Sequence, residues 1–148
     1  MKNLYTNRKA FHNYFIEEKF EAGIVLCGSE VKSCRGGYID LTDAYVTIDN
    51  GNLVMHNAFI SAYNHASFSN HEEKRKRILL MHKKEILKLY QKINIKGLTL
   101  IPISFYLKGG LIKVEVALAK GKHNYDKREA LKNKTLKKEL KNGLVVKN

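Results

Sequence analysis

The stretch "LTLIPISFYLKGGLIKVEVALA" (residues 98–119) decides the fold, because it contains two β-rich runs separated by a turn signal. Lys108-Gly109-Gly110 lies between the runs and predicts a tight antiparallel hairpin. Pro102 has no N–H to donate to a ladder, so we expect its strand to be an edge or to carry a bulge there. In the second run apolar and charged residues alternate, which predicts one face turned to the core; the inward positions are Ile112, Val114, Val116 and Leu118.

The sequence predicts further strands on the N-terminal side of this hairpin. Residues 14–28 ("YFIEEKFEAGIVLCG") are typical of a strand with polar interruptions. Residues 44–48 ("AYVTI") and 53–60 ("LVMHNAFI") flank Asp49-Asn50-Gly51-Asn52, the strongest short turn signal in the chain. A second hairpin is therefore expected at this turn.

Two segments predict helices. In residues 29–37 ("SEVKSCRGG"), Ser29 is a suitable N-cap and Glu30 suits the helix dipole, while Lys32 points outward. Apolar residues recur at helical spacing up to Gly97, which predicts a helix that starts near Leu80. Residues 61–77 are polar and aperiodic, and we expect a long loop there.

These elements predict a protein that is mainly β with helices: an antiparallel, OB-like β-barrel of about six strands flanked by two to three helices. We expect the barrel to span residues 1–119 and a basic C-terminal tail to span 120–148. Barrels of this type commonly bind oligonucleotides, although fold alone does not establish function.

The charge is large and clustered. The 148 residues include 27 Lys and Arg against 14 Asp and Glu, and residues 119–148 hold ten of these cations and only three of the acids. Such clustering favours a polyanionic partner, either nucleic acid or an anionic membrane surface; a merely solubilising tail is the alternative. Leu131, Leu136 and Leu140 are the only plainly apolar residues between 119 and 142, too few to offset the entropy of ordering them, so we expect the tail to be disordered when free.

Composition also bears on location. The first twenty residues lack the apolar region of a signal peptide, and no run is long enough for a membrane helix. Cys27 and Cys34 form no zinc or disulfide pattern, and we expect both to be reduced and half-buried in a cytoplasmic protein.

Catalytic and metal-binding motifs are missing from the sequence. Glu17, Glu18 and Glu21 are interpreted as solvating a half-exposed strand, with Glu17 and Glu21 on one face, and Asp40 and Asp43 as turn or cap residues. The six histidines show no metal-ligand spacing. We therefore expect no enzyme activity, no metal and no cofactor.

Two segments mix cations with aromatic rings, a composition suited to phosphate contact and base stacking. In residues 7–15 ("NRKAFHNYF"), Phe11 and Tyr14 either stack on bases or pack in the core beside a solvated basic turn. Residues 119–128 ("AKGKHNYDKR") have the same makeup beyond the last strand, with less core to join.

Four stretches closely resemble the SsrA-binding protein family (small protein B): "NRKAFHNYFIEEKFEAGIVLCGSEVKSCRGG", "NHEEKRKRILLMHKKEI", "KGLTLIPISFYLKGG" and "KVEVALAKGKHNYDKRE". The resemblance runs from about Asn7 to Leu140. It implies a monomeric, non-catalytic adaptor that binds the tRNA-like domain of transfer-messenger RNA (tmRNA), stands in for the anticodon arm and enters stalled ribosomes for trans-translation. Glu73 stands where the family usually has Pro, and "KNKTLKK" differs from the family's usual tail.

The resemblance also implies which residues act. On the barrel the RNA-facing candidates are Glu21, Leu80 and Lys113, with Asn7, Arg8, Lys9 and His12 on the same surface; we add the outward Lys32. The tail is implied to lie in the decoding centre and along the mRNA channel, with these candidates: Lys120, Gly121, Lys122, Tyr125, Asp126, Lys127, Arg128, Lys132, Lys134, Lys137 and Lys138. A generic single-strand RNA-binding OB protein or a ribosomal protein is the alternative function.

Overall fold

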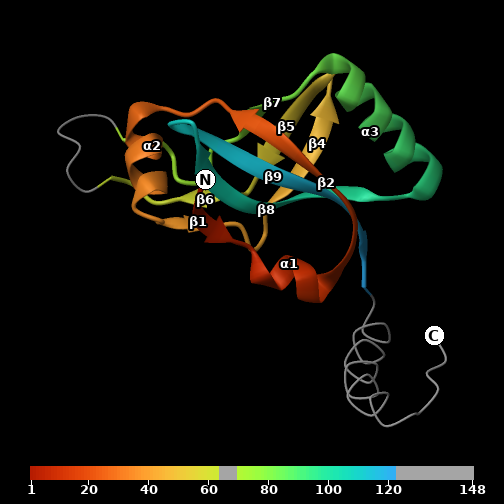
Figure 1. Ribbon diagram of the computed structural model, residues 1–148, viewed down its shortest axis with the longest axis horizontal. Coiled ribbons are helices and arrows are strands. Elements are labelled where there is room, and N and C mark those ends of the chain that lie inside the picture. Colours follow the sequence, from red (N-terminus) through yellow and green to blue (C-terminus); the bar gives the residue numbers. More distant parts are fainter. Residues whose placement is uncertain (64–69, 123–148) are drawn as a thin grey trace, which may run out of the picture.

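The computed structural model describes residues 1–63 and 70–122, and its centre is a closed antiparallel barrel (Figure 1). Six strands form the ring in the order β8-β4-β5-β7-β2-β9, and β9 pairs back onto β8. Their bounds are Thr99–Lys108, Tyr45–Asp49, Asn52–His56, Arg77–Leu80, Tyr14–Ile24 and Leu111–Gly121, in the same order. Strand β1 (Lys2–Thr6) adds to the edge of β8, and β3 (Ile39–Asp40) pairs separately with β6 (Phe59–Ile60).

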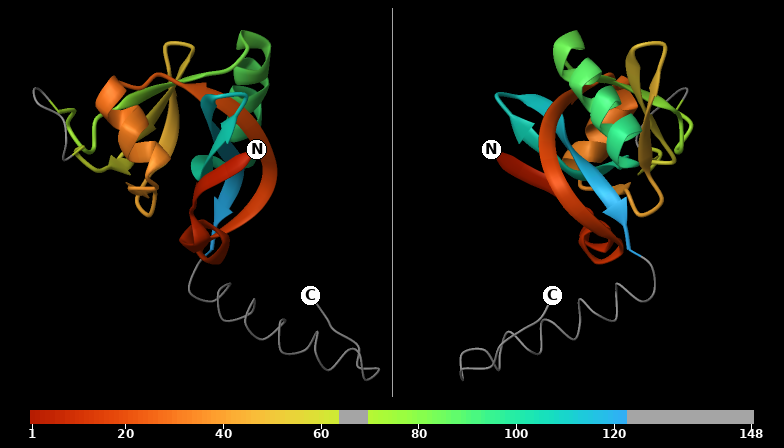
Figure 2. Two further views of the ribbon diagram at one scale, coloured as in Figure 1. Left: turned by 60° about the vertical axis from the view of Figure 1, so that its left-hand side comes forward. Right: turned by 90° about the vertical axis from the view of Figure 1, so that its right-hand side faces the viewer.

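Among the described residues, three helices flank the barrel, namely α1 (Arg8–Asn13), α2 (Gly28–Arg35) and α3 (Lys83–Lys96). Figure 2 shows β2 curving around the barrel, with α1 beside the end of β9. The predicted mainly-β fold with about six strands and two to three helices is thus confirmed. No helix in residues 1–63 or 70–122 is long and apolar enough to cross a bilayer.

The hairpin of residues 98–119 forms as predicted. Lys108 pairs with Leu111, so that Gly109 and Gly110 make a two-residue loop. The register shifts between Pro102 and Ser104, which is the bulge expected where proline removes a donor.

The main core fills the barrel and extends to two helices. The inward residues of β9 pack with Cys34 of α2 and with Ile86 and Leu89 of α3. A second cluster lies on the outer face of the β8–β9 ladder, where Ala10 of α1 packs on Ala117 and Ala119. Residues 116–119 of β9 are therefore buried on both faces, and α1 covers the outer one.

Several elements differ from the sequence prediction. Strand β1 and helix α1 were not predicted, and α3 begins at Lys83 rather than near Leu80. Residues 77–80 form β7 because a ladder is available on each side: Leu80 lies opposite Gly23 of β2, and Leu79 lies opposite Leu53 of β5. Paired on both edges, this apolar run is a strand despite its helical spacing.

Helix α2 is capped differently from the prediction. Cys27, not Ser29, is the N-cap, and its backbone N–H donates to Glu30 Oε1 at 2.8 Å. The Ser29 hydroxyl instead hydrogen-bonds the ring of His71 at 2.8 Å. The expectation of two half-buried cysteines is also wrong, since Cys27 is exposed and Cys34 is buried.

A buried ion-pair network ties α2 to β7. The Glu30 carboxylate accepts from Arg77 Nε and from Arg75 at 2.5 Å each, and both Glu30 and Arg77 are fully buried. Burial alone would raise the pKa of Glu30, but the hydrogen bonds from Arg75, the Cys27 backbone and Arg77 outweigh it and lower the pKa to about 2. Arg77 also donates to the carbonyl of Ala58 at 2.7 Å. The network thus fixes the chain just before Leu80.

Candidate nucleic-acid interface

Glu21, Leu80 and Lys113 line one surface hollow of about 570 Å³. They come from three different strands, β2, β7 and β9, which are neighbours in the ring. Gly23 of β2 lies opposite Leu80 on one side and opposite Lys113 on the other. The three barrel residues singled out in the sequence are therefore neighbours in space.

Gly23 keeps the middle of this hollow open. A Cβ at this position would lie 3.3 Å from the Cβ of Leu80, closer than carbons ordinarily approach. Gly23 has no Cβ, and the Leu80 side chain beside it has 56% of its area exposed. An exposed leucine in the same hollow as a carboxylate and an ammonium group offers apolar contact to a flat ligand face. The sequence did not mark Gly23 as part of the site.

Glu21 is held in place as an anion. The Tyr106 hydroxyl donates to its Oε2 at 2.5 Å, and Lys108 Nζ lies 3.3 Å from the same oxygen. The Tyr106 hydrogen bond, with the nearby charges of Lys108 and Lys113, lowers the pKa of Glu21. Burial and the bond to Glu21 together raise the pKa of Tyr106. At neutral pH the site thus presents a fixed acceptor beside the Lys113 donor.

Sequence reasoning missed Tyr106 and Lys108. One signal was available, because Tyr106 lies opposite Lys113 in the predicted β8–β9 hairpin. Its hydroxyl reaches Glu21 only because β9 is also paired with β2 on its other edge. That second pairing joins residues far apart in the chain, so the local pattern did not reveal it.

The residues of the "NRKA" segment separate into two groups. Arg8, Lys9 and His12 are exposed on or beside α1. Asn7 is 3% exposed, and its side-chain amide donates to the carbonyls of Leu41 at 3.0 Å and Pro102 at 3.2 Å. Assigning Asn7 to the RNA-facing surface was therefore wrong: its amide is used inside the protein to join the start of α1 to β8.

The aromatic residues of the same segment also differ from one another. Phe11 is 43% exposed, whereas Tyr14 packs against the second apolar cluster. The core interpretation holds for Tyr14 but not for Phe11, and base stacking by Phe11 stays a prediction. None of Arg8, Lys9 and His12 lines the hollow with Glu21.

Lys32 is exposed on α2, as the helical spacing predicted. Its Nζ lies 5.3 Å from the centre of the Tyr63 ring, a cation–π distance. Lys32 does not line the hollow with Leu80, so its assignment to the same surface has no support from the geometry.

The candidates at the start of the tail belong to the barrel. Lys120 and Gly121 are in β9, opposite Phe15 and Tyr14, so the strand extends two residues beyond the expected boundary. The backbone N–H of Lys122 donates to the Asn13 carbonyl at 2.8 Å. The remaining candidates lie outside the described residues: Tyr125, Asp126, Lys127, Arg128, Lys132, Lys134, Lys137 and Lys138.

Four of the five acidic residues considered above, namely Glu17, Glu18, Glu21 and Asp40, have structural partners. Glu18 accepts from Lys92 at 2.7 Å, and Glu17 lies 4.0 Å from Lys96, both on α3. A register shift between Ile16 and Glu18 interrupts the regular alternation from which Glu17 and Glu21 were expected to share a face. Asp40 accepts from the backbone of Thr42, the predicted turn role. Within residues 1–63 and 70–122, no three His, Cys, Asp or Glu side chains are grouped to hold a metal ion.

A closed antiparallel barrel, a formal charge of +13 and a hollow lined by a carboxylate, a leucine and a lysine define a class: small basic β-barrel proteins built like oligonucleotide binders. Within that class, a family model described as "SmpB protein" matches residues 4–145. The chain belongs to the SmpB protein family.

Individual relatives agree with this assignment. The chain is 54% identical over 140 residues to the SsrA-binding protein of Persephonella marina, with 95% of this chain and 92% of that protein covered. It is 55% identical over 135 residues to the SsrA-binding protein of a Sulfurihydrogenibium species, with 91% and 89% covered. A chain in a solved structure described as "tmRNA-SmpB: a journey to the center of the bacterial ribosome" superposes with a TM-score of 0.69 at 42% identity, covering 86% of this chain and 93% of that one.

Proposed function

We propose that this chain binds the tRNA-like domain of tmRNA, occupies the place of the missing anticodon arm and delivers the RNA to stalled ribosomes. Relatives of the chain are named SsrA-binding proteins, and one structural neighbour is described as "tmRNA-SmpB: a journey to the center of the bacterial ribosome". The observation that carries the proposal is the convergence of Glu21, Leu80 and Lys113 on one hollow. The chain acts as an adaptor and catalyses no reaction.

The chemistry of the hollow supports a folded RNA as the ligand. Lys113 offers a cation to a phosphate, and the ionised Glu21 accepts hydrogen bonds from a ribose hydroxyl or a base amino group. Leu80 offers apolar contact to a base or sugar face. A site that combines a lysine, the carboxylates of Glu21 and Glu85 and apolar side chains selects for shape and register more than for charge alone.

The test compares Lys113→Ala and Glu21→Ala with Lys84→Ala, which removes an exposed lysine of α3 that does not line the hollow. Lys113→Ala should weaken binding to the tRNA-like domain by about 1.5–3 kcal/mol, the usual contribution of a charge-assisted contact. Glu21→Ala should also weaken it. Equal affinities for all three variants would remove the hollow from the interface.

Salt dependence separates the two roles. A lysine that neutralises a phosphate releases counterions, so Lys113→Ala should reduce the slope of log affinity against log salt by about one. Glu21→Ala should leave that slope unchanged. Competition with oligo(U) then tests specificity, because a generic single-strand binder would prefer neither RNA.

We further propose a division between the barrel and the C-terminal segment. The barrel, residues 1–121, binds the RNA. The basic segment beyond Lys122 enters the decoding centre and the mRNA channel. The support is the charge distribution, since eight cations and three acids lie in residues 123–148. Ribosomal RNA is the polyanion that such a segment would meet.

A further inference from the structure

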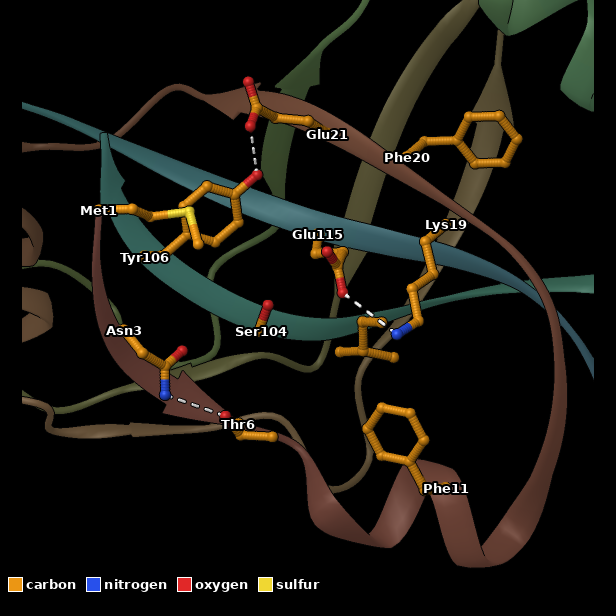
Figure 3. Close-up of a pocket in the computed structure, with 11 residues that line it drawn as sticks. Met1, Asn3, Thr6, Phe11, Lys19, Phe20, Glu21, Ser104, Tyr106 and Glu115 are labelled. Atoms are coloured by element: carbon orange, nitrogen blue, oxygen red, sulfur yellow. Dashed lines mark hydrogen bonds and ion pairs between the residues drawn. The ribbon is translucent and has the colours of Figure 1, made fainter. Parts of the chain in front are cut away.

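A second hollow lies beside the first, on the outer face of the barrel. It has a volume of about 430 Å³, within the usual range for small-ligand sites. Figure 3 shows Phe11 and Lys19 on one side of it, Tyr106 and Met1 on the other, and Ser104 between them.

Glu21 lines both hollows, so they are continuous parts of one surface. Its Oε2 atom is fixed by the Tyr106 hydroxyl at 2.5 Å, and Tyr106 itself lines the second hollow only. A nucleotide adjacent to the one bound across Leu80 and Lys113 would therefore reach the second hollow.

One wall of this hollow is an exposed aromatic ring. Phe11 stands on α1 with 43% of its area exposed, and Lys19 Nζ lies 5.5 Å from the centre of its ring. Exposed rings beside a cation are the side chains on which unpaired bases stack.

The polar groups of the hollow favour a base over a phosphate. Glu21 and Glu115 both contribute carboxylates, and Lys19 Nζ lies 4.0 Å from Glu115 Oε1. Two carboxylates repel a phosphate group, whereas they accept hydrogen bonds from the amino group of a base. The Asn3 amide, which donates to Thr6 Oγ1 at 3.0 Å, closes the opposite edge.

We propose that the second hollow receives one unpaired nucleobase of the bound RNA, stacked on Phe11, with its exocyclic amino group donating to Glu115. The inference rests on the proposed function, because the base belongs to the RNA that occupies the first hollow. The inference adds a stacking contact to the proposed function. It also predicts a preference for bases with an exocyclic amino group over uracil, which has none.

The first test uses two matched rings. Phe11→Ala should weaken binding to the folded tRNA-like domain roughly five- to hundredfold, the range measured for losing one base-stacking ring. Phe15→Ala is the control: this ring is 44% exposed and also lies under a lysine, Lys122, at 4.7 Å, but it does not line the hollow. It should change affinity less than twofold. Equal losses in both variants, or none in Phe11→Ala, overturn the proposal.

A second variant decides between base and phosphate. Glu115→Gln removes a negative charge, so a phosphate in the hollow would bind more tightly. An amino group donating to the carboxylate predicts weaker binding, about three- to tenfold, because a charge-assisted bond is replaced by a neutral one. Tighter or unchanged binding contradicts the proposal.

The outcomes also separate the two hypotheses. If the wild-type chain binds the tRNA-like domain and Phe11→Ala and Glu115→Gln bind it equally well, the base site is refuted. The proposed function is then not affected. Wild-type chain that fails to bind that RNA refutes both.

Discussion

Glu30 illustrates how much one buried side chain determines. It closes the capping box of α2 and is the common partner of Arg75 and Arg77. Since Arg77 opens β7, the carboxylate links α2 to the strand that carries Leu80. A single residue outside the hollow thus supports the position of one of its walls.

Replacing Glu30 by Gln should destabilise the protein by about 3–5 kcal/mol, because the buried Arg77 charge then lacks its partner. The pH dependence follows from the lowered pKa of about 2 against an ordinary value of 4.5. Stability from an acid with a depressed pKa is complete above 4.5 and is lost as the pH falls toward 2. Urea unfolding between pH 7 and pH 2 measures both effects.

The matched control is Glu72→Gln, which removes the same charge from an exposed position. It should change the free energy of unfolding by less than about 0.5 kcal/mol. If the Glu30 variant shows the same acid-induced loss as wild type between pH 4.5 and 2, another carboxylate governs that loss.

The two cysteines should react very differently. Burial raises the pKa of Cys34 to about 12, so its thiolate is scarce and shielded, while Cys27 is exposed at the start of α2. A thiol reagent such as dithionitrobenzoate should modify one cysteine in the native protein and two in denaturant. Cys27→Ser should abolish the native reaction, and a native count of two would mean that the core around Cys34 opens readily.

At the scale of elements, the end of α3 depends on one backbone conformation. Gly97 adopts φ +63°, and its N–H donates to the Ile93 carbonyl at 2.9 Å, an αL C-cap. Gly97→Ala should destabilise the protein by about 1–2 kcal/mol, because a Cβ is strained in this region. Thermal unfolding at fixed pH provides the measurement.

Gly28→Ala provides the comparison for that variant. Gly28 is the first residue of α2 and has no positive φ, and a Cβ there would meet no atom within 4 Å. It should be neutral or stabilise by up to about 1 kcal/mol. Equal destabilisation by both alanines would mean that helix propensity, rather than the αL cap, is being measured.

Elements with strong local signals were predictable, and those formed by long-range pairing were not. The β8–β9 hairpin, its Pro102 bulge and the stop of α3 at Gly97 follow from neighbouring residues. Strand β1 ("KNLYT") is largely polar and exists through its pairing with β8, about a hundred residues away. Helix α1 has six residues and no side-chain cap, so the local sequence gave no signal that predicted it.

The same contrast holds within the candidate site. The resemblance identified Glu21, Leu80 and Lys113, but their common hollow depends on the register of three strands around Gly23. Glu30 was predicted to suit a helix dipole, yet its partners lie 45 and 47 residues further along the chain. Long-range ion pairs of this kind leave no periodic trace in a sequence.

At the scale of the whole molecule, the barrel is complete before the basic segment begins. The β2–β9 ladder ends with Tyr14 opposite Gly121, and Lys122 adds one backbone bond to Asn13. Both hollows lie on this barrel. Folding and RNA binding should therefore be separable from whatever the residues after Lys122 contribute.

A chain ending at Lys122 should unfold within about 0.5 kcal/mol of the full chain, since every described contact is retained. It should keep most of its affinity for the tRNA-like domain, yet fail to support tagging of peptides on stalled ribosomes in a reconstituted translation reaction. The control is a full-length chain carrying Lys113→Ala, which should regain tagging at higher RNA concentration because its defect is affinity alone. Loss of RNA binding in the shortened chain, or full tagging by it, would contradict the proposed division of roles between the barrel and the basic segment.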